Sequence, residues 1–126
     1  MRFLLDTHAL LWAVATPTEL PPRVRELLED GSRDVLVSAA STWEIAIKQA
    51  LGKLELDLHA LLSAVKALAF SELPIRFEHS VRAGSLPPHH RDPFDRMLVA
   101  QALEEGLTIV TRDPAFGLYA AATLWA

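Results

Sequence analysis

The chain has 126 residues, contains no cysteine and carries a formal net charge of −4 at pH 7. Its length is typical of one domain, so we expect a single domain over residues 1–126. The charge argues against a broadly basic nucleic-acid-binding surface, and the lack of cysteine excludes disulfides and thiolate metal sites. No apolar run is long enough to span a membrane, and Asp6 and His8 interrupt any signal-peptide core. We therefore expect a cytoplasmic protein.

The first half of the chain alternates short apolar runs with helix signals. An apolar run that ends in an acid is typical of a buried strand, and prolines and glycines mark where helices begin and end. The predicted elements are a strand over residues 3–5, a helix over 7–15, a helix with Pro21 and Pro22 in its first turn that Gly31 caps, a strand over 35–37, and a helix from Ser38 or Ser41 to Leu51 with an apolar stripe of Trp43, Ile47, Ala50 and Leu51.

The second half continues the alternation. Asp92 followed by Pro93 is the clearest helix start in the chain, because it joins an N-cap acid to a proline at the first helical position. The predicted elements are helices over 56–68, 77–84 and 93–105, a loop over 86–90, and strands over 70–75, 107–111 and 124–125. Strands alternating with helices predict an α/β domain with a mainly parallel sheet.

Four acids occupy similar positions in this pattern. Asp6 and Asp113 each follow a predicted strand, while Glu44 and Asp95 lie in the first turns of two predicted helices. In a parallel α/β sheet the carboxyl ends of the strands and the N-termini of the following helices lie at one edge, where ligands bind. We therefore expect the four carboxylates to converge.

Converging carboxylates need a counter-charge. Two of them about 4 Å apart repel by roughly 4 kcal/mol at an effective dielectric constant of about 20, so protons or divalent cations must fill the space between them. Oxygen ligands without cysteine or a paired histidine motif suit Mg²⁺ or Mn²⁺ and not Zn²⁺. Metals held in this way commonly serve phosphoryl chemistry, because they polarise the phosphate and lower the pKa of an attacking water.

Each acid can also be explained by a role in the fold alone, and the sequence leaves the functional and the structural explanation open. Asp92 is best explained as a helix N-cap. The other structural explanations are an N-cap at Asp6, a capping box from Ser41 to Glu44, an ion pair between Glu44 and Lys48, a helix-dipole contact at Asp95, and a turn at Asp113-Pro114.

Several other residues lie near the predicted acidic edge. Arg91, Arg96 and Arg112 flank three of the acids and would suit phosphate contacts or solvated surface charge; Thr7, next to Asp6, is a further candidate for substrate binding. His89 and His90 are adjacent and cannot easily bind one ion, so we expect a loop near substrate or polar surface. The tryptophans at positions 12, 43 and 125 are expected in the core or at an interface.

Four sequence blocks occur in the order of a known family: LLDTHALLW at residues 4–12, SAASTWEIAIK at 38–48, HHRDPFDRMLVAQA at 89–102 and TRD at 111–113. With these blocks the chain resembles PIN-domain ribonucleases and, within them, the VapC-type toxins of toxin–antitoxin modules. The resemblance implies a three-layer α/β/α sandwich around a mainly parallel sheet of four to five strands. It places the metal-binding and catalytic carboxylates at Asp6, Glu44, Asp95 and Asp113.

The resemblance also implies an activity and partners. Members of this family are typically Mg²⁺- or Mn²⁺-dependent endoribonucleases that hydrolyse RNA phosphodiester bonds. They tend to form homodimers and are inhibited by a small antitoxin protein that covers the site. The expected enzyme is therefore a Mg²⁺-dependent endoribonuclease with an RNA substrate.

Two alternatives belong to other functional classes. A haloacid dehalogenase-like phosphatase also begins with a strand and a nucleophilic Asp, but its chemistry needs a second Asp two residues later, where this chain has His8. A non-cleaving RNA- or protein-binding module would use an apolar groove between the helix that carries Trp43 and the helix over residues 56–68.

Overall fold

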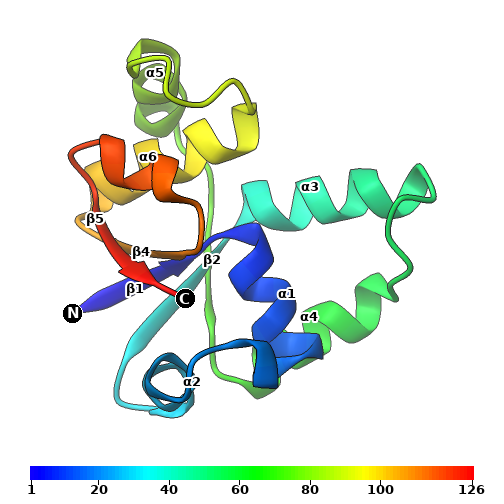
Figure 1. Ribbon diagram of the computed structural model, residues 1–126. Coiled ribbons are helices and arrows are strands. Elements are labelled where there is room, and N and C mark those ends of the chain that lie inside the picture. Colours follow the sequence, from blue (N-terminus) through cyan, green and yellow to red (C-terminus); the bar gives the residue numbers. More distant parts are fainter.

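The computed structural model describes residues 1–126 and shows a parallel sheet between two groups of helices (Figure 1). The strands are β1 (Arg2–Leu5), β2 (Asp34–Ser38), β3 (Ser71–Leu73), β4 (Thr108–Thr111) and β5 (Ala122–Trp125). The helices are α1 (Thr7–Ala15), α2 (Pro22–Glu29), α3 (Ala39–Ala50), α4 (Leu58–Ala67), α5 (Phe77–Ser85) and α6 (Pro93–Glu105), with short 3₁₀ helices η1 (Pro17–Glu19) and η2 (Pro114–Leu118). The predicted α/β/α sandwich is confirmed.

The sheet has the strand order β3-β2-β1-β4-β5, and every neighbouring pair is parallel. The chain builds outward from β1 to β2 and β3, then returns through α5 and α6 to the other side of β1. The strand order therefore reverses between β1 and β4. In parallel α/β sheets such a reversal opens a crevice at the carboxyl ends of the two strands.

Two hydrophobic cores cover the two faces of the sheet, because successive residues of a strand point to opposite faces. On one face, Phe3 and Leu5 pack with buried residues of α1, α2 and α4. On the other, Leu4 packs with buried residues of α6 and η2. Figure 1 shows the same division, with α5 lying outside α6. Strand β1 is thus buried on both sides, and it fixes the position of Asp6, the residue that follows it.

Helix boundaries follow local capping chemistry in most places. Asp92 accepts hydrogen bonds from the backbone N–H groups of Phe94 (2.8 Å) and Asp95 (3.2 Å), which confirms it as the N-cap of α6. Gly106 ends that helix with φ 68°, a left-handed conformation that favours glycine. Gly52, with φ 72°, follows α3 in the same way.

Three predictions about helices were wrong. Helix α2 ends at Glu29 with Asp30 as its C-cap, so Gly31 caps nothing. Of the two predicted starts of α3, Ser38 is confirmed as its N-cap, so the capping box from Ser41 to Glu44 is wrong. The predicted apolar stripe of α3 is not its buried face, because Trp43 is 60% exposed and the residues of α3 that are buried include Ser41 and Glu44.

None of the helices is both long enough and apolar enough to pass through a lipid bilayer.

Candidate functional site

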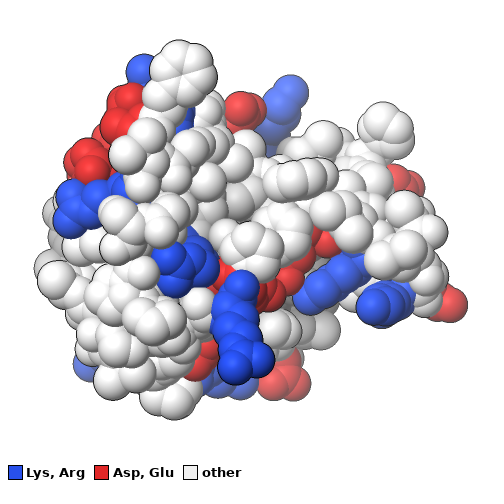
Figure 2. Space-filling view, turned by 90° about the horizontal axis from the view of Figure 1, so that it is seen from above, with Lys and Arg blue, Asp and Glu red and all other residues white.

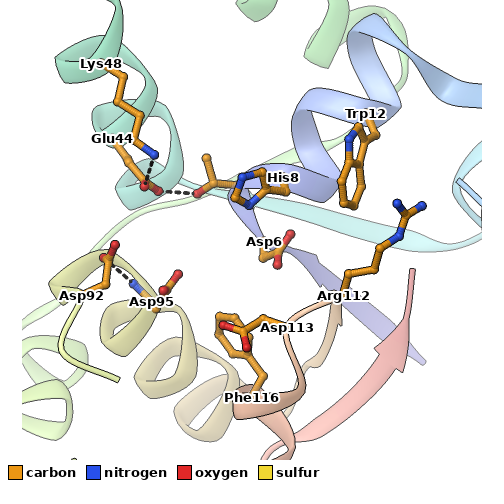
Figure 3. A pocket seen from close by; sticks show the side chains of 11 residues that line it. Asp6, His8, Trp12, Glu44, Lys48, Asp92, Asp95, Arg112, Asp113 and Phe116 are labelled. Carbon is orange, nitrogen blue, oxygen red and sulfur yellow. Dashed lines mark hydrogen bonds and ion pairs between the residues drawn. The ribbon is translucent and has the colours of Figure 1, made fainter. Parts of the chain in front are cut away.

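A cleft of about 450 Å³ opens at the carboxyl edge of the sheet, where the strand order reverses (Figure 3). Figure 2 looks onto the molecule from above in the orientation of Figure 1, and there carboxylates gather in a hollow with Lys and Arg side chains beside it. The cleft is lined by Asp6, Thr7, His8, Trp12, Glu44, Lys48, Asp92, Asp95, Arg112, Asp113 and Phe116. All four predicted acids therefore line one cleft, although they come from four different segments of the chain.

Asp6 is held at the floor of this cleft by β1. Its backbone N–H donates to the Val110 carbonyl of β4 (3.1 Å), and its Oδ1 accepts from the Ala9 N–H (2.8 Å). Asp6 is therefore the N-cap of α1 and also a cleft residue, so its two predicted roles are compatible. Burial raises the pKa of Asp6, although hydrogen bonds from the Thr111 side chain and the Ala9 N–H act in the opposite direction.

Glu44 reaches the cleft from α3 and is bound on both carboxylate oxygens. The Thr7 hydroxyl donates to its Oε1 (2.7 Å), and the Lys48 ammonium lies 3.0 Å from its Oε2. The predicted ion pair one helical turn apart is present. Glu44 is only 7% exposed, so these two partners hold its carboxylate in one place.

Asp95 projects from the first turn of α6 and is the most perturbed acid of the site. Burial, and then the nearby charges of Asp92, Glu44 and Asp6, raise its pKa to about 7, while His90 acts in the opposite direction. The raised pKa reflects burial first and the nearby negative charges second. Carboxyl groups perturbed in this way often lie at functional sites.

Asp113 follows β4 and lies opposite Asp95 across His90. Burial raises the pKa of Asp113, but hydrogen bonds from the His90 ring and the Ala115 N–H outweigh it, so the pKa is lowered. The distances from His90 Nε2 are 3.0 Å to Asp113 Oδ2 and 4.0 Å to Asp95 Oδ2. Ligand atoms of these three residues lie within 4.8 Å of one another.

The donor set of the cleft suits a hard divalent cation. Five carboxylates line the cleft, those of Asp6, Glu44, Asp92, Asp95 and Asp113. Burial is the main cause of the raised pKa of Asp95, and the charges of neighbouring carboxylates add to it. Lys48 pairs with Glu44, and His90 lies 3.0 Å from Asp113. Asp6 and Glu44 lie outside the tighter group of His90, Asp95 and Asp113. Oxygen-rich sites of this kind favour Mg²⁺ or Mn²⁺.

The three predicted phosphate-binding arginines lie in different settings. Arg112 lines the cleft, and its guanidinium lies 4.1 Å from the centroid of the Trp12 ring. Arg91 is exposed and does not line the cleft. Arg96 also lies outside the cleft lining; its guanidinium donates to four backbone carbonyls, those of Ala83, Leu86, Pro87 and His90. Those four bonds favour a structural role for Arg96 over the predicted phosphate contact.

Some residues of the site were not found from the sequence. Trp12, expected in a core or interface, forms part of the cleft wall beside His8 and Arg112. His90 was expected in a loop near substrate or on the polar surface; it does lie in a loop, but it is buried and bonded to Asp113. No local pattern separates His90 from the exposed His89, because its burial depends on Phe116 and Tyr119 far along the chain.

Comparisons with known proteins agree with this geometry. Residues 3–122 match the model of the PIN domain family. The chain is 31% identical over 113 residues to Ribonuclease VapC22 of Mycobacterium tuberculosis (strain ATCC 25618 / H37Rv). The aligned region covers 87% of this chain and 85% of that protein.

Solved structures share the fold at lower identity. A chain of VapBC2 from Rickettsia felis, bound to a promoter DNA fragment, has a TM-score of 0.72 at 15% identity, with 98% of both chains covered. A chain of DNA-bound VapBC from Salmonella typhimurium has a TM-score of 0.73 at 18% identity, covering 98% of this chain and 97% of that one. The acidic cleft, the family match over most of the chain and the related ribonuclease together show that this chain belongs to the PIN domain family.

Proposed function

We propose that the chain is a metal-dependent endoribonuclease and the toxin of a toxin–antitoxin pair, acting on RNA in the cytoplasm. The observation that carries this proposal is the convergence of Asp6, Glu44, Asp95 and Asp113 in one cleft at the reversal of strand order. It is supported by the relative named Ribonuclease VapC22. The phosphatase alternative has no such support, since His8 stands where that chemistry needs a second Asp.

The four carboxylates would hold Mg²⁺, with Mn²⁺ as an alternative. The raised pKa of Asp95 supports a cation at this place, because a positive charge would favour its ionised form. When bound, the ion supplies Lewis-acid polarisation of a phosphate and lowers the pKa of water.

The protein's own residues prepare the cleft for a phosphodiester. Thr7 and Lys48 fix the Glu44 carboxylate, and the capping bond to Ala9 fixes Asp6. Arg112 lies at the cleft wall, where its positive charge would attract the RNA backbone. Thr7 acts in this scheme mainly by holding Glu44, and Arg91 is placed at the surface for a more distant phosphate contact.

The test is cleavage of a mixture of structured RNAs with Mg²⁺, with Mn²⁺ and with chelator. Asp6→Asn and Asp95→Asn are expected to lower the Mg²⁺-dependent rate by at least about 100-fold. Substitution of residues that only support the metal ligands typically lowers activity by roughly 10–100-fold. Asp34→Asn is a matched control, since Asp34 is exposed at the start of β2, away from the cleft. Wild-type rates in either cleft variant would contradict the assignment.

We further propose two protein partners, a small antitoxin and a second copy of the chain. Structural neighbours of this fold come from VapBC complexes. Phe77 and Val81 lie one turn apart on α5 and are 90% and 76% exposed, which favours a protein contact there. Light scattering of wild type and of Phe77→Ser should show a dimer that the substitution weakens.

A further inference from the structure

The His90 ring lies in a loop at the edge of the cleft, and packing and hydrogen bonds hold it in place. Its ring is stacked on Tyr119, with 7° between the ring planes and 5.5 Å between the ring centroids, and it packs against Phe116 at 4.6 Å. Both His90 and Tyr119 are buried, at 9% and 8% exposure. The ring therefore has one orientation, with Nδ1 toward Tyr119 and Nε2 toward Asp113.

The hydrogen bonds around Tyr119 assign the proton on this ring. The backbone N–H of His90 donates to the Tyr119 hydroxyl oxygen (2.9 Å), and Nδ1 lies 3.1 Å from the same oxygen. If the hydroxyl accepts from the backbone and donates to Nδ1, each of these polar atoms has a partner. Nδ1 would then be without a proton, and the proton of the neutral ring would be on Nε2, which lies 3.0 Å from Asp113 Oδ2 and would donate to it.

Asp113 needs such support because β4 alone does not fix its side chain. That side chain is 42% exposed, and Asp113 lies on the turn between β4 and η2. Its Oδ1 accepts from the Ala115 N–H (2.9 Å), which leaves Oδ2 to His90. With both oxygens bound, the carboxylate cannot rotate away from Asp95.

We propose that Tyr119 and His90 are positioning residues, and that Tyr119 fixes the His90 tautomer so that Nε2–H orients the Asp113 carboxylate in the cleft. This proposal rests on the proposed nuclease function, since it gives Asp113 its reason to be oriented. Partners behind a metal-binding carboxylate commonly set its orientation and affinity.

The competing role for His90 is direct metal binding, since its Nε2 lies with Asp95 and Asp113 in a group that can hold an ion. The two roles exclude one another. A nitrogen that carries a proton has no lone pair left for a metal, so Nε2 cannot donate to Asp113 and bind an ion at the same time.

The first experiment reads the tautomer in the metal-free full-length chain. At pH 8.5 the ¹⁵N shifts of the His90 ring should show a protonated Nε2 and an unprotonated Nδ1. In Tyr119→Phe, which removes one oxygen and keeps the ring stack, the two tautomers should mix. A protonated Nδ1 in the wild type would overturn the proposal.

The second experiment measures Mn²⁺ affinity by titration calorimetry. His90→Phe keeps an aromatic ring without a donor and should weaken binding roughly 10–100-fold, and Tyr119→Phe should weaken it in the same direction. His90→Gln, whose amide can replace the Nε2–H donor, should recover most of the affinity. His89→Phe is the matched control, because His89 is exposed and makes only an edge contact with Tyr119.

Wild-type Mn²⁺ affinity in both His90→Phe and Tyr119→Phe would overturn the positioning role. Pulsed electron spin resonance of the Mn²⁺-bound wild type should detect no directly bonded nitrogen, and a nitrogen signal that disappears in His90→Phe would make His90 a ligand instead. If the wild type binds no divalent ion, the proposed nuclease function fails, while the ring ¹⁵N shifts still decide the role of Tyr119 and His90.

Discussion

Asp95 carries the strongest electrostatic conflict in the protein. Its backbone position in the first turn of α6 suits an acid, since the positive end of the helix dipole lies there. Burial and three neighbouring carboxylates nevertheless raise its pKa from 3.8 to about 7. The folded state therefore favours the protonated form of Asp95. When Asp95 ionises without a cation nearby, the free energy of unfolding falls.

This conflict predicts a pH dependence of stability. Between pH 4 and 7 the folded state holds a proton on Asp95 that the unfolded state has released, so the free energy of unfolding falls as pH rises through this range. Asp95→Asn should remove that part of the dependence and raise the melting temperature of the chelated protein at pH 8 by several degrees, since about 1 kcal/mol shifts a domain of this size by roughly 3–6 °C.

The comparison is made by thermal melts of both proteins in chelator at pH 5 and pH 8. Asp34→Asn serves as the control, because Asp34 is exposed at the start of β2 and does not line the cleft. If wild type and Asp95→Asn differ by the same amount at the two pH values, the Asp95 carboxyl does not titrate abnormally.

The connection between α5 and α6 illustrates how one side chain can shape an element of the site. Arg96 donates to four carbonyls on the segment that leads from α5 to His90, at distances of 2.7–3.4 Å. The planar guanidinium fork reaches all four at once, which a lysine ammonium cannot do. The loop over residues 86–90, rich in proline and without regular structure, thereby presents His90 to the cleft.

Replacing Arg96 should therefore loosen this loop. Arg96→Met is expected to lower the free energy of unfolding by roughly 2–4 kcal/mol, because four carbonyls, three of them in part-buried bonds, lose charged hydrogen-bond donors, and Arg96→Lys should recover little of it. Arg91→Met, at the exposed neighbour five residues earlier, should change stability by less than about 0.5 kcal/mol. Urea denaturation measures both; equal stability of the two variants would contradict the structural role of Arg96.

At the scale of the whole molecule, the acidic cleft costs stability that the two cores must supply. Strand β1 is buried against both cores and delivers Asp6 without freedom to move away from the other acids. The helices that carry Glu44 and Asp95 pack from opposite sides of the sheet edge, so repulsion cannot open the cleft without breaking the cores. A divalent cation bound in the cleft, as proposed, would relieve the repulsion and so favour the folded state.

The whole protein should therefore melt at a higher temperature with Mg²⁺ or Mn²⁺. A ligand at 100 times its dissociation constant stabilises by about 2.7 kcal/mol, equivalent to roughly 10 °C for this size. The double variant Asp6→Asn/Asp95→Asn should show no such shift, and neither metal should protect it. An equal shift in the double variant would place the cation outside the cleft.

The sequence by itself determined those features of the protein that depend on neighbouring residues. Asp92-Pro93 and Gly106 mark the ends of α6, and the apolar run before Asp6 marks a buried strand, because caps and buried strands have local chemistry. The alternation of elements was enough to predict the parallel sheet. With it came the expectation that four acids meet at one edge.

Only the tertiary structure decided which side chains complete that edge. His90 is buried because Phe116 and Tyr119 pack on it. Arg96 lies outside the cleft lining because its guanidinium is bonded to four backbone carbonyls. Of the two predicted starts of α3, Ser38 is the N-cap, and its hydroxyl also donates to the buried Gln101 of α6. These choices depend on contacts between residues far apart in the chain, and no local pattern carries them.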